Sequence, residues 1–198
     1  MNLFSSEIQE LKLPNAELIY VPRCFSDEES EFFFNQLRHH VPWQQDDIKV
    51  FGKVYAQPRL TALYGESDKS YSYSGITMLP HTFTNDLMDI KNKVETFTDC
   101  KFSTVLLNLY RDGSDSNGWH ADNEKELGNN PVIASVSFGA PRWFHFKHRT
   151  IKTEKHKILL ESGSLLIMKG EMQHHWLHQI PKTKKPVGER INLTFRKL

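Results

Sequence analysis

The amino-acid sequence predicts an α+β fold in which two helices precede a β-sandwich or β-barrel. Helical patterns are confined to the first hundred residues, whereas short β-branched and aromatic runs separated by Gly, Pro and Asn dominate the remainder. The length of 198 residues, with 38% hydrophobic residues, is sufficient for one compact domain with its own core. We therefore expect the two helices to pack on one face of a sheet.

The first helix is expected to begin at Ser26. Three acidic residues follow Ser26, and Glu29 is placed to complete a capping box. Its apolar face would consist of Phe33, Phe34 and Leu37. The second helix is expected after Thr84, where apolar residues recur at helical spacing. These residues are Leu87, Ile90, Val94 and Phe97.

Six later segments have the composition of short strands. They span residues 105–110, 133–137, 143–147, 158–160, 164–168 and 190–196. Residues 1–20 are interpreted as an extension that ends in a short apolar stretch. Residues 35–74 contain turn residues without a clear period, so no element is assigned there.

The composition argues against several classes of protein. Two cysteines, Cys24 and Cys100, can form neither a disulfide framework nor a closed zinc site, which favours a reducing compartment. No run approaches the roughly 18 apolar residues that a membrane span requires, and the N-terminus lacks the basic and apolar regions of a signal peptide. We expect a monomer in the cytoplasm, or in the nucleus if the source is eukaryotic, without membrane contact.

Charge is distributed unevenly along the chain although the net charge is only +1. Residues 1–48 contain nine acidic and three basic residues, whereas residues 142–157 and 182–197 each contain six basic residues and one acidic residue. A polyanion is one partner that such a surface would attract. A pair of solvated basic loops explains the same pattern.

A candidate metal site begins with His120 and Asp122. Side chains two positions apart in an extended backbone point to the same side, so these two can share a metal. Further candidate ligands follow another strand-like run: His174, His175 and His178. Two histidines and one carboxylate on one face of an octahedron are typical of non-haem Fe(II) sites. The alternative is a hydrogen-bonded His–Asp pair with the later histidines on a surface loop.

The segment 190–196 carries a second polar pattern. As a strand, it would place Arg190, Asn192, Thr194 and Arg196 on one face and apolar residues on the other. Two buried guanidinium groups require anionic partners, and a dicarboxylate ligand would supply both. Asn108 and Tyr110 share a face of an earlier strand and could line the same cavity. An exposed edge strand with outward polar residues is the alternative.

Six ordered motifs resemble the AlkB family of Fe(II)- and 2-oxoglutarate-dependent dealkylases, with greatest similarity to members that repair double-stranded DNA. They are NLYRDG at 108–113, HADNE at 120–124, ASVSFGA at 134–140, GSLL at 163–166, HWLH at 175–178 and RINLTFRK at 190–197. The likeness extends from about residue 58 to the C-terminus. It implies a double-stranded β-helix (jelly-roll) core at 101–198. An N-terminal extension and first helix at 1–40 and a nucleotide-recognition lid with a supporting helix at 41–100 would complete one compact domain.

The resemblance also implies roles for individual residues in catalysis and in cofactor binding. The iron ligands would be His120, Asp122 and His178. Arg190 and Arg196 would pair with the two carboxylates of 2-oxoglutarate, and O₂ would be the second co-substrate. The remainder of the 2-oxoglutarate pocket would be formed by Asn108, Tyr110 and Thr194.

Substrate contacts are implied for two regions. Phe51 and Gly52 match an aromatic finger that fills the gap left by an extracted base. Lid positions are matched by Arg59, Tyr71, Ser72 and Tyr73. Asn123 stands where similar proteins have a second acid after the iron-binding aspartate. The adjacent Glu124 could instead attract a positively charged base.

The implied reaction is direct-reversal DNA repair. N-alkylated bases of the N1-methyladenine and N3-methylcytosine type would be oxidatively demethylated, with release of formaldehyde and succinate. The expected partner is alkylated DNA, double-stranded because of the Phe51 finger and the basic loops. Single-stranded DNA, RNA or a methylated protein side chain are alternative substrates of the same chemistry. A non-catalytic damage-binding module and a structural metal protein are the remaining alternatives.

Overall fold

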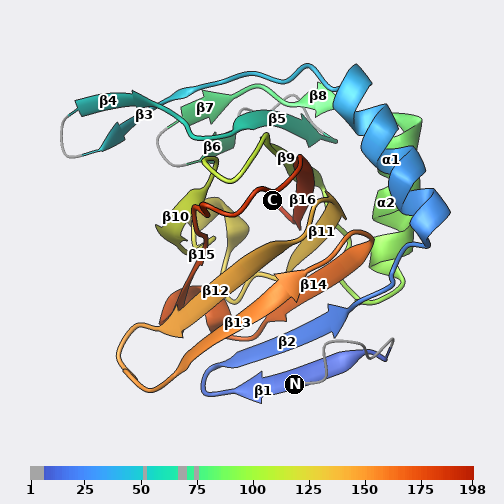
Figure 1. Ribbon diagram of the computed structural model, residues 1–198. Helices are drawn as coiled ribbons and strands as arrows, with labels where there is room; N and C mark the ends of the chain where they lie inside the picture. The colour runs from blue at the N-terminus through green and yellow to red at the C-terminus, as the bar shows by residue number, and fades with distance from the viewer. Residues whose placement is uncertain (1–6, 51–52, 67–70, 74–75) are drawn as a thin grey trace.

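Two β-sheets stack face to face, and two helices cover the outer side of the larger sheet (Figure 1). This computed structural model describes residues 7–50, 53–66, 71–73 and 76–198. The predicted combination of two helices and a β-sandwich is confirmed. No helix in these described ranges is both long and apolar enough to cross a membrane.

The larger sheet has eight strands that come from all parts of the chain. In spatial order they are β1 (Gln9–Leu13), β2 (Ala16–Val21), β14 (Ser164–Lys169), β11 (Ile133–Gly139), β16 (Arg190–Arg196), β9 (Thr104–Tyr110), β5 (Leu60–Gly65) and β8 (His81–Thr82). All neighbouring pairs are antiparallel except β5 and β8. The strand formed by residues 190–196 therefore lies inside the sheet rather than at its edge.

The smaller sheet has four antiparallel strands. Their order is β10 (Asn117–His120), β15 (Trp176–Ile180), β12 (Arg142–His148) and β13 (Lys155–Leu160). Two separate hairpins consist of β3 (Asp47–Val50) with β4 (Lys53–Ala56) and β6 (Tyr71–Tyr73) with β7 (Ile76–Met78). Short helical turns occur at η1 (Lys125–Leu127) and α3 (Met172–His175).

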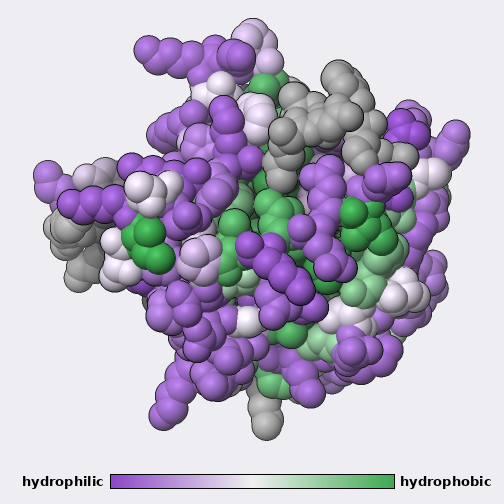
Figure 2. Space-filling view, turned by 90° about the horizontal axis from the view of Figure 1, so that it is seen from below, coloured by the Kyte–Doolittle hydropathy of each residue, from purple (hydrophilic) through white to green (hydrophobic). Residues whose placement is uncertain are grey.

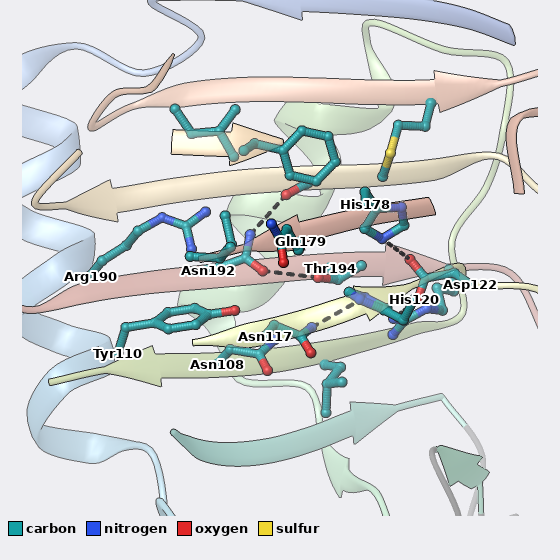
Figure 3. A pocket seen from close by; sticks show the side chains of 17 residues that line it. Asn108, Tyr110, Asn117, His120, Asp122, His178, Gln179, Arg190, Asn192 and Thr194 are labelled. Atoms are coloured by element: carbon teal, nitrogen blue, oxygen red, sulfur yellow. Dashed lines mark hydrogen bonds and ion pairs between the residues drawn. The ribbon is translucent and has the colours of Figure 1, made fainter. Parts of the chain in front are cut away.

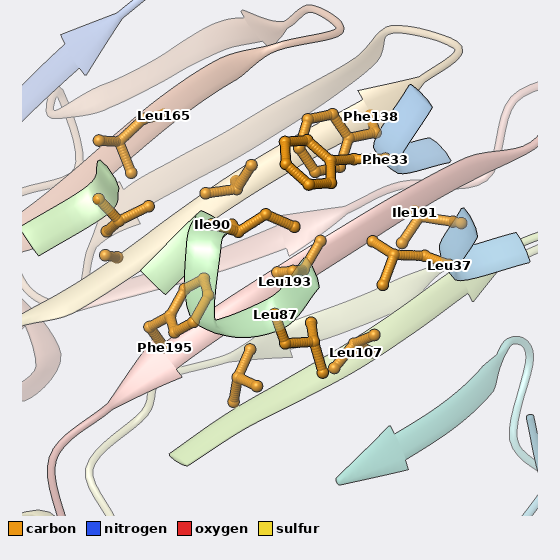
Figure 4. Close-up of a cluster of buried hydrophobic side chains, with 14 of the residues drawn as sticks. Phe33, Leu37, Leu87, Ile90, Leu107, Phe138, Leu165, Ile191, Leu193 and Phe195 are labelled. Carbon is orange, nitrogen blue, oxygen red and sulfur yellow. The ribbon is translucent and has the colours of Figure 1, made fainter. Parts of the chain in front are cut away.

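The two long helices begin where the sequence predicts. Helix α1 (Asp27–His40) has Ser26 as N-cap, and the complete capping box with Glu29 is present. Helix α2 (Asn85–Glu95) is capped by the Thr84 side chain. Both helices bury their apolar faces against the eight-stranded sheet (Figure 4). The helical side chains labelled there are Phe33, Leu37, Leu87 and Ile90.

Strand β16 separates two interiors. Its apolar residues Ile191, Leu193 and Phe195 are fully buried on the helix side of the sheet. Its polar residues face the space between the sheets and line a pocket there: Arg190, Asn192, Thr194 and Arg196. Because side chains alternate along a strand, this single segment joins the helix-packed core to the pocket wall.

A second core fills the rest of the space between the sheets. It includes Leu18, Phe144, Phe146, Leu166 and Trp176, which come from both sheets. Seen from below, the surface has hydrophilic side chains at its margin and hydrophobic ones gathered towards the middle (Figure 2).

The strands do not follow the expected segment limits at residues 40 and 100. Residues 9–21, interpreted as part of an extension, form β1 and β2, and β2 pairs with β14. Strand β5 pairs with β9 although it lies in the region expected to form a lid. The eight-stranded sheet therefore includes strands from all three expected segments.

A buried carboxylate fixes the end of helix α2. Glu95, with a 5% exposed side chain, accepts hydrogen bonds from Lys101 Nζ and from the Phe102 backbone, both at 2.8 Å, and lies 3.1 Å from Lys91 Nζ. Burial alone would raise the pKa of Glu95, but these donors outweigh it and lower the pKa below its usual range.

Replacing Glu95 by Gln should lower the free energy of unfolding at pH 7 by roughly 1.5–3 kcal/mol, the range for hydrogen bonds to charged groups. The depressed pKa stabilises the fold above about pH 4.3, the ordinary value for Glu, and this contribution disappears as the pH falls through the folded pKa. Urea unfolding at both ends of that window measures the effect. The exposed Glu10→Gln variant is the control. The prediction is contradicted if Glu95→Gln lowers the free energy of unfolding as much at low pH as at pH 7.

Candidate active site

A pocket between the two sheets contains the polar residues identified from the sequence (Figure 3). Arg190 and Tyr110 lie towards one end of the view, and His120, Asp122 and His178 lie towards the other. Strands β9 and β16 supply one wall, and β10 and β15 supply part of the opposite wall. The fold thus brings two clusters of residues into one cavity: a set of potential metal ligands and a buried cation.

The first group is a cluster of three potential metal ligands. One ligand atom from each of His120, Asp122 and His178 lies within 4.8 Å of the others. Strands β10 and β15 pair so that His120 is directly opposite His178, and their ring centroids are 4.3 Å apart. Among the histidines left open by the sequence, His178 joins the cluster, whereas His175 lies on α3 and stacks on His148.

Hydrogen bonds orient these ligands. Nδ1 of His120 lies 2.7 Å from the carbonyl oxygen of Gly118, which can only accept, so this nitrogen carries the proton and Nε2 keeps its lone pair. The backbone N–H of Asp122 donates to the side-chain oxygen of Gln173 at 2.9 Å. Oδ2 of Asp122 lies 3.7 Å from Nε2 of His178. These contacts hold the three candidate ligands close together.

The surroundings keep both histidines neutral and Asp122 ionised. Burial lowers the pKa of His120, and burial together with His120 lowers the pKa of His178 to about 3. Burial opposes ionisation of Asp122, but Arg196 and the two histidines outweigh this effect and hold its pKa below the usual range. Two neutral imidazoles and one carboxylate fit Fe(II) and leave further coordination positions open.

The second group centres on a buried cation. Arg190 is 1% exposed and donates from Nη2 to Ser137 Oγ at 2.8 Å, while its Nε and Nη1 have no hydrogen-bond partner among the described residues. Burial lowers the pKa of this guanidinium to about 10, so it remains charged at neutral pH. Its Cζ lies 5.2 Å from the ring centroid of Tyr110. A buried cation with two unused donors matches a carboxylate ligand.

Arg196 occupies a different position. Its Nη2 donates to Asp122 Oδ1 at 2.7 Å, and both side chains are 2% exposed. The second arginine of the predicted pair therefore contacts a candidate metal ligand directly. It fixes the carboxylate and neutralises its charge in the buried site.

The remaining pocket amides and hydroxyls form short connections. Asn192 donates to Ser135 Oγ at 2.8 Å, and Thr194 donates to the Asn192 side-chain oxygen at 3.1 Å. Asn108 accepts from Arg59 Nε at 2.7 Å. The structure thus places each predicted 2-oxoglutarate residue on the pocket wall: Asn108, Tyr110, Arg190, Thr194 and Arg196.

Arg59, for which the resemblance implies a lid position, is buried beside the pocket. It precedes β5, is 4% exposed, and donates from Nη1 to the Ser116 carbonyl at 3.2 Å in addition to its bond with Asn108. The guanidinium is consequently buried beside the pocket wall. It connects this wall to the loop before β10.

The other predicted substrate residues that the structure describes lie in two places. Phe51 and Gly52 lie outside the described residues. Strand β6 contains the lid positions Tyr71, Ser72 and Tyr73 and pairs with β7. Asn123 is exposed, whereas Glu124 is half-buried and its Oε2 lacks a hydrogen-bond partner within the described chain. Burial and the charge of Asp122 raise the pKa of Glu124.

Sequence reasoning missed four polar residues of this region. Ser135 and Ser137 alternate with apolar residues in β11, so the period of the strand could have identified them. Asn117 donates to Nε2 of His120 at 3.2 Å, and Gln173 orients the Asp122 backbone. No local pattern identifies Asn117 or Gln173, because only the fold brings them to the ligands.

Comparison with known proteins decides the family. The sequence profile of the 2OG-Fe(II) oxygenase superfamily matches residues 17–196. DNA oxidative demethylase ALKBH2 of Homo sapiens is 37% identical over 184 residues, which cover 88% of this chain and 70% of the human protein. This chain belongs to the AlkB family of 2OG-Fe(II) oxygenases.

Alpha-ketoglutarate-dependent dioxygenase alkB homolog 3 is also similar to this AlkB-family chain. The Bos taurus protein is 43% identical over 183 residues, and the Homo sapiens protein is 41% identical over 178 residues. In both cases 85% of the chain is covered, but it spans only 62% of the relative's length.

The solved structure of OsALKBH1 shows the same fold. It superposes with a TM-score of 0.64, covering 97% of the AlkB-family chain and 100% of the other chain at 16% identity. The predicted jelly-roll architecture is thereby confirmed. The lid is not part of that result.

Proposed function

We propose that this AlkB-family protein oxidatively demethylates N-alkylated DNA bases, with Fe(II), 2-oxoglutarate and O₂ as cofactor and co-substrates. N1-methyladenine and N3-methylcytosine are the proposed lesions, and formaldehyde and succinate are the proposed products. The observation that carries the proposal is the proximity of a His–Asp–His cluster to a buried arginine with two unused donors. One pocket can therefore hold a metal and a dicarboxylate together.

The side chains perform binding and orientation in this proposal. His120, Asp122 and His178 would hold Fe(II), which supplies the oxidising chemistry together with 2-oxoglutarate and O₂. Arg190 would bind the distal carboxylate with Nε and Nη1. Arg196 would keep Asp122 ionised and meet the carboxylate at the keto-acid end.

The protein would also have to select a cationic base. Oε2 of Glu124 is buried without a hydrogen-bond partner in the described structure, two residues after Asp122. A methyl group on N1 of adenine or N3 of cytosine gives the base a positive charge. Glu124 would attract that charge, replacing the second acid for which Asn123 stands in this chain.

The proposal extends to the form of the DNA and to the place in the cell where the protein acts. The expectation of a duplex depends on Phe51, outside the described residues, and on the basic loops. The name of one relative, DNA oxidative demethylase, supports DNA as the substrate. We propose that the protein acts where the DNA is, in the cytoplasm or in the nucleus of a eukaryote.

Anaerobic reconstitution with Fe(II) and 2-oxoglutarate tests the proposal. O₂ would then be added with methylated single-stranded DNA, duplex DNA, RNA or a methylated peptide. We expect formaldehyde, succinate and repaired base in equal amounts with DNA. Turnover of RNA or peptide alone would overturn the DNA assignment, and binding of methylated DNA without any product would indicate a damage-binding module.

Replacing Glu124 by Gln should lower kcat/KM for 1-methyladenine about ten-fold, equivalent to roughly 1.4 kcal/mol of lost charge attraction. A neutral N6-methyladenine substrate should lose much less, because its base carries no positive charge. Product analysis of both substrates measures this ratio. The exposed Glu126→Gln variant is the matched control. An unchanged ratio in the Glu124 variant would remove the proposed role.

A further inference from the structure

We propose that the outer face of the four-stranded sheet binds the unpaired DNA strand that flanks the base in the active site. This inference rests on the proposed function and extends it to a second contact surface. The surface is defined by Trp119, Trp143, Lys147, Lys155 and Lys157, and we call it the outer platform. These residues come from strands β10, β12 and β13.

The outer platform is cationic without acidic residues. Strands β10, β12, β13 and β15 contain no Asp or Glu. Burial alternates along β12, with Phe144 and Phe146 buried and Trp143 and Lys147 outward. In β13, Lys155 and Lys157 are exposed. The pattern places three lysines on one face, where they attract phosphate groups.

Two indole rings lie among these lysines. Trp119 is 41% exposed and Trp143 is 37% exposed. Lys147 Nζ lies 4.2 Å from the Trp119 ring centroid, and Lys157 Nζ lies 4.7 Å from that of Trp143. Cation–π contacts of this kind hold the rings in place at the surface. Each indole therefore offers an exposed, oriented aromatic surface.

Alternating cations and exposed aromatic rings are suited to a single strand. Unpaired bases can stack on the rings while the lysines neutralise the neighbouring phosphates. The bases of a duplex are already stacked and would leave the two indoles unused. Acidic peptides would engage the lysines only. We therefore assign single-stranded DNA to the outer platform.

The edge strand β10 connects the outer platform to the active site. It is the outermost strand of the sheet; Trp119 contacts Lys147 on the outer face, whereas the adjacent His120 lines the pocket. His120 belongs to the candidate metal cluster, while Trp119 belongs to the platform. A strand whose alkylated base occupies the pocket can thus continue around this edge to Trp119.

The test compares a methylated trinucleotide with a single-stranded 20-mer carrying the same lesion. The charge-reversal variant Lys147→Glu/Lys157→Glu and the ring-removal variant Trp143→Ala should each raise KM for the 20-mer roughly ten-fold or more. Turnover of the trinucleotide should stay at the parental level, since it is too short to reach the platform. Lys12→Glu, exposed on β1, is the matched charge control.

Binding of an unmodified 20-mer, followed by fluorescence anisotropy, gives a readout independent of turnover. The double lysine variant should lower the dependence of log K on log salt concentration by about 1.4, because two phosphate contacts are lost. If the charge reversal impairs folding, the milder Lys147→Gln/Lys157→Gln variant replaces it. This variant should also lower the dependence of log K on log salt concentration.

Three results would overturn the platform. They are parental 20-mer affinity in all platform variants, equal losses on the trinucleotide and the 20-mer, and an equal loss of affinity for a 20-base-pair duplex and for the single strand in the platform variants. Failure of the proposed function would look different. In that case no methylated DNA would be turned over by any protein, while anisotropy would still detect the platform.

Discussion

The Asp122→Ala variant is expected to lose Fe(II) binding and about 3–5 kcal/mol of stability together. Both losses arise because one carboxylate has two tasks. It belongs to the three-residue metal cluster and accepts a 2.7 Å hydrogen bond from Arg196 in a setting where both side chains are 2% exposed. Removing one partner of a buried ion pair destabilises a protein much more than replacing both partners by apolar residues, because the remaining charge is left buried without a counter-charge.

Two measurements check this result. Anaerobic calorimetric titration with Fe(II) or Mn(II) should show that the affinity for the metal is at least about 100-fold weaker. Loss of a residue that only orients a metal ligand typically costs about 10- to 100-fold, so loss of a ligand itself should cost at least as much. Urea unfolding without metal should show the loss of stability. Asp89→Ala, at an exposed position of α2, should match the parental protein in both assays. Parental metal affinity in the Asp122 variant would contradict the assignment of this ligand.

The Arg190→Met variant is expected to lose 2-oxoglutarate binding without losing stability. A buried guanidinium without an ion-pair partner carries a desolvation cost that an apolar side chain of similar volume does not. Arg190 fits this case because two of its donors have no hydrogen-bond partner in the described structure. Loss of a buried charged contact should weaken 2-oxoglutarate binding about 100-fold or more.

Thermal unfolding with and without 2-oxoglutarate separates the two effects. At 100 times its dissociation constant a ligand stabilises the native state by about 2.7 kcal/mol, so the parental protein should melt at a higher temperature. The variant should show no such shift at the same concentration, although its ligand-free stability is preserved. Arg149→Met, at an exposed position, serves as the control. A retained shift would exclude Arg190 from the carboxylate site.

Local patterns predicted the parts of the fold that short-range chemistry determines. The capping box at Ser26 and Glu29 marked the start of α1, and alternation along 190–196 separated the core face of β16 from its pocket face. Both signals depend on neighbouring residues alone. They are readable because caps and side-chain alternation are local properties of the backbone.

Long-range pairing explains what the sequence could not predict. Strand β10 has the sequence NGWH and β15 has WLHQI, neither of which has a clear β pattern, yet their pairing brings His120 opposite His178. Residues 16–21 have a strand-like composition but give no indication that β14 is their neighbour. The resemblance placed Arg59 on a lid, and nothing local in the sequence indicates its bond to Asn108.

The position of β16 has a consequence for how the protein is made. This strand lies between β11 and β9, both of which leave the ribosome earlier. The edges of β11 and β9 that will pair with β16 remain without that partner until residues 190–196 emerge and insert between them. Because β16 also carries both arginines, a chain truncated before it would lack the centre of its sheet and be prone to aggregation rather than partly active.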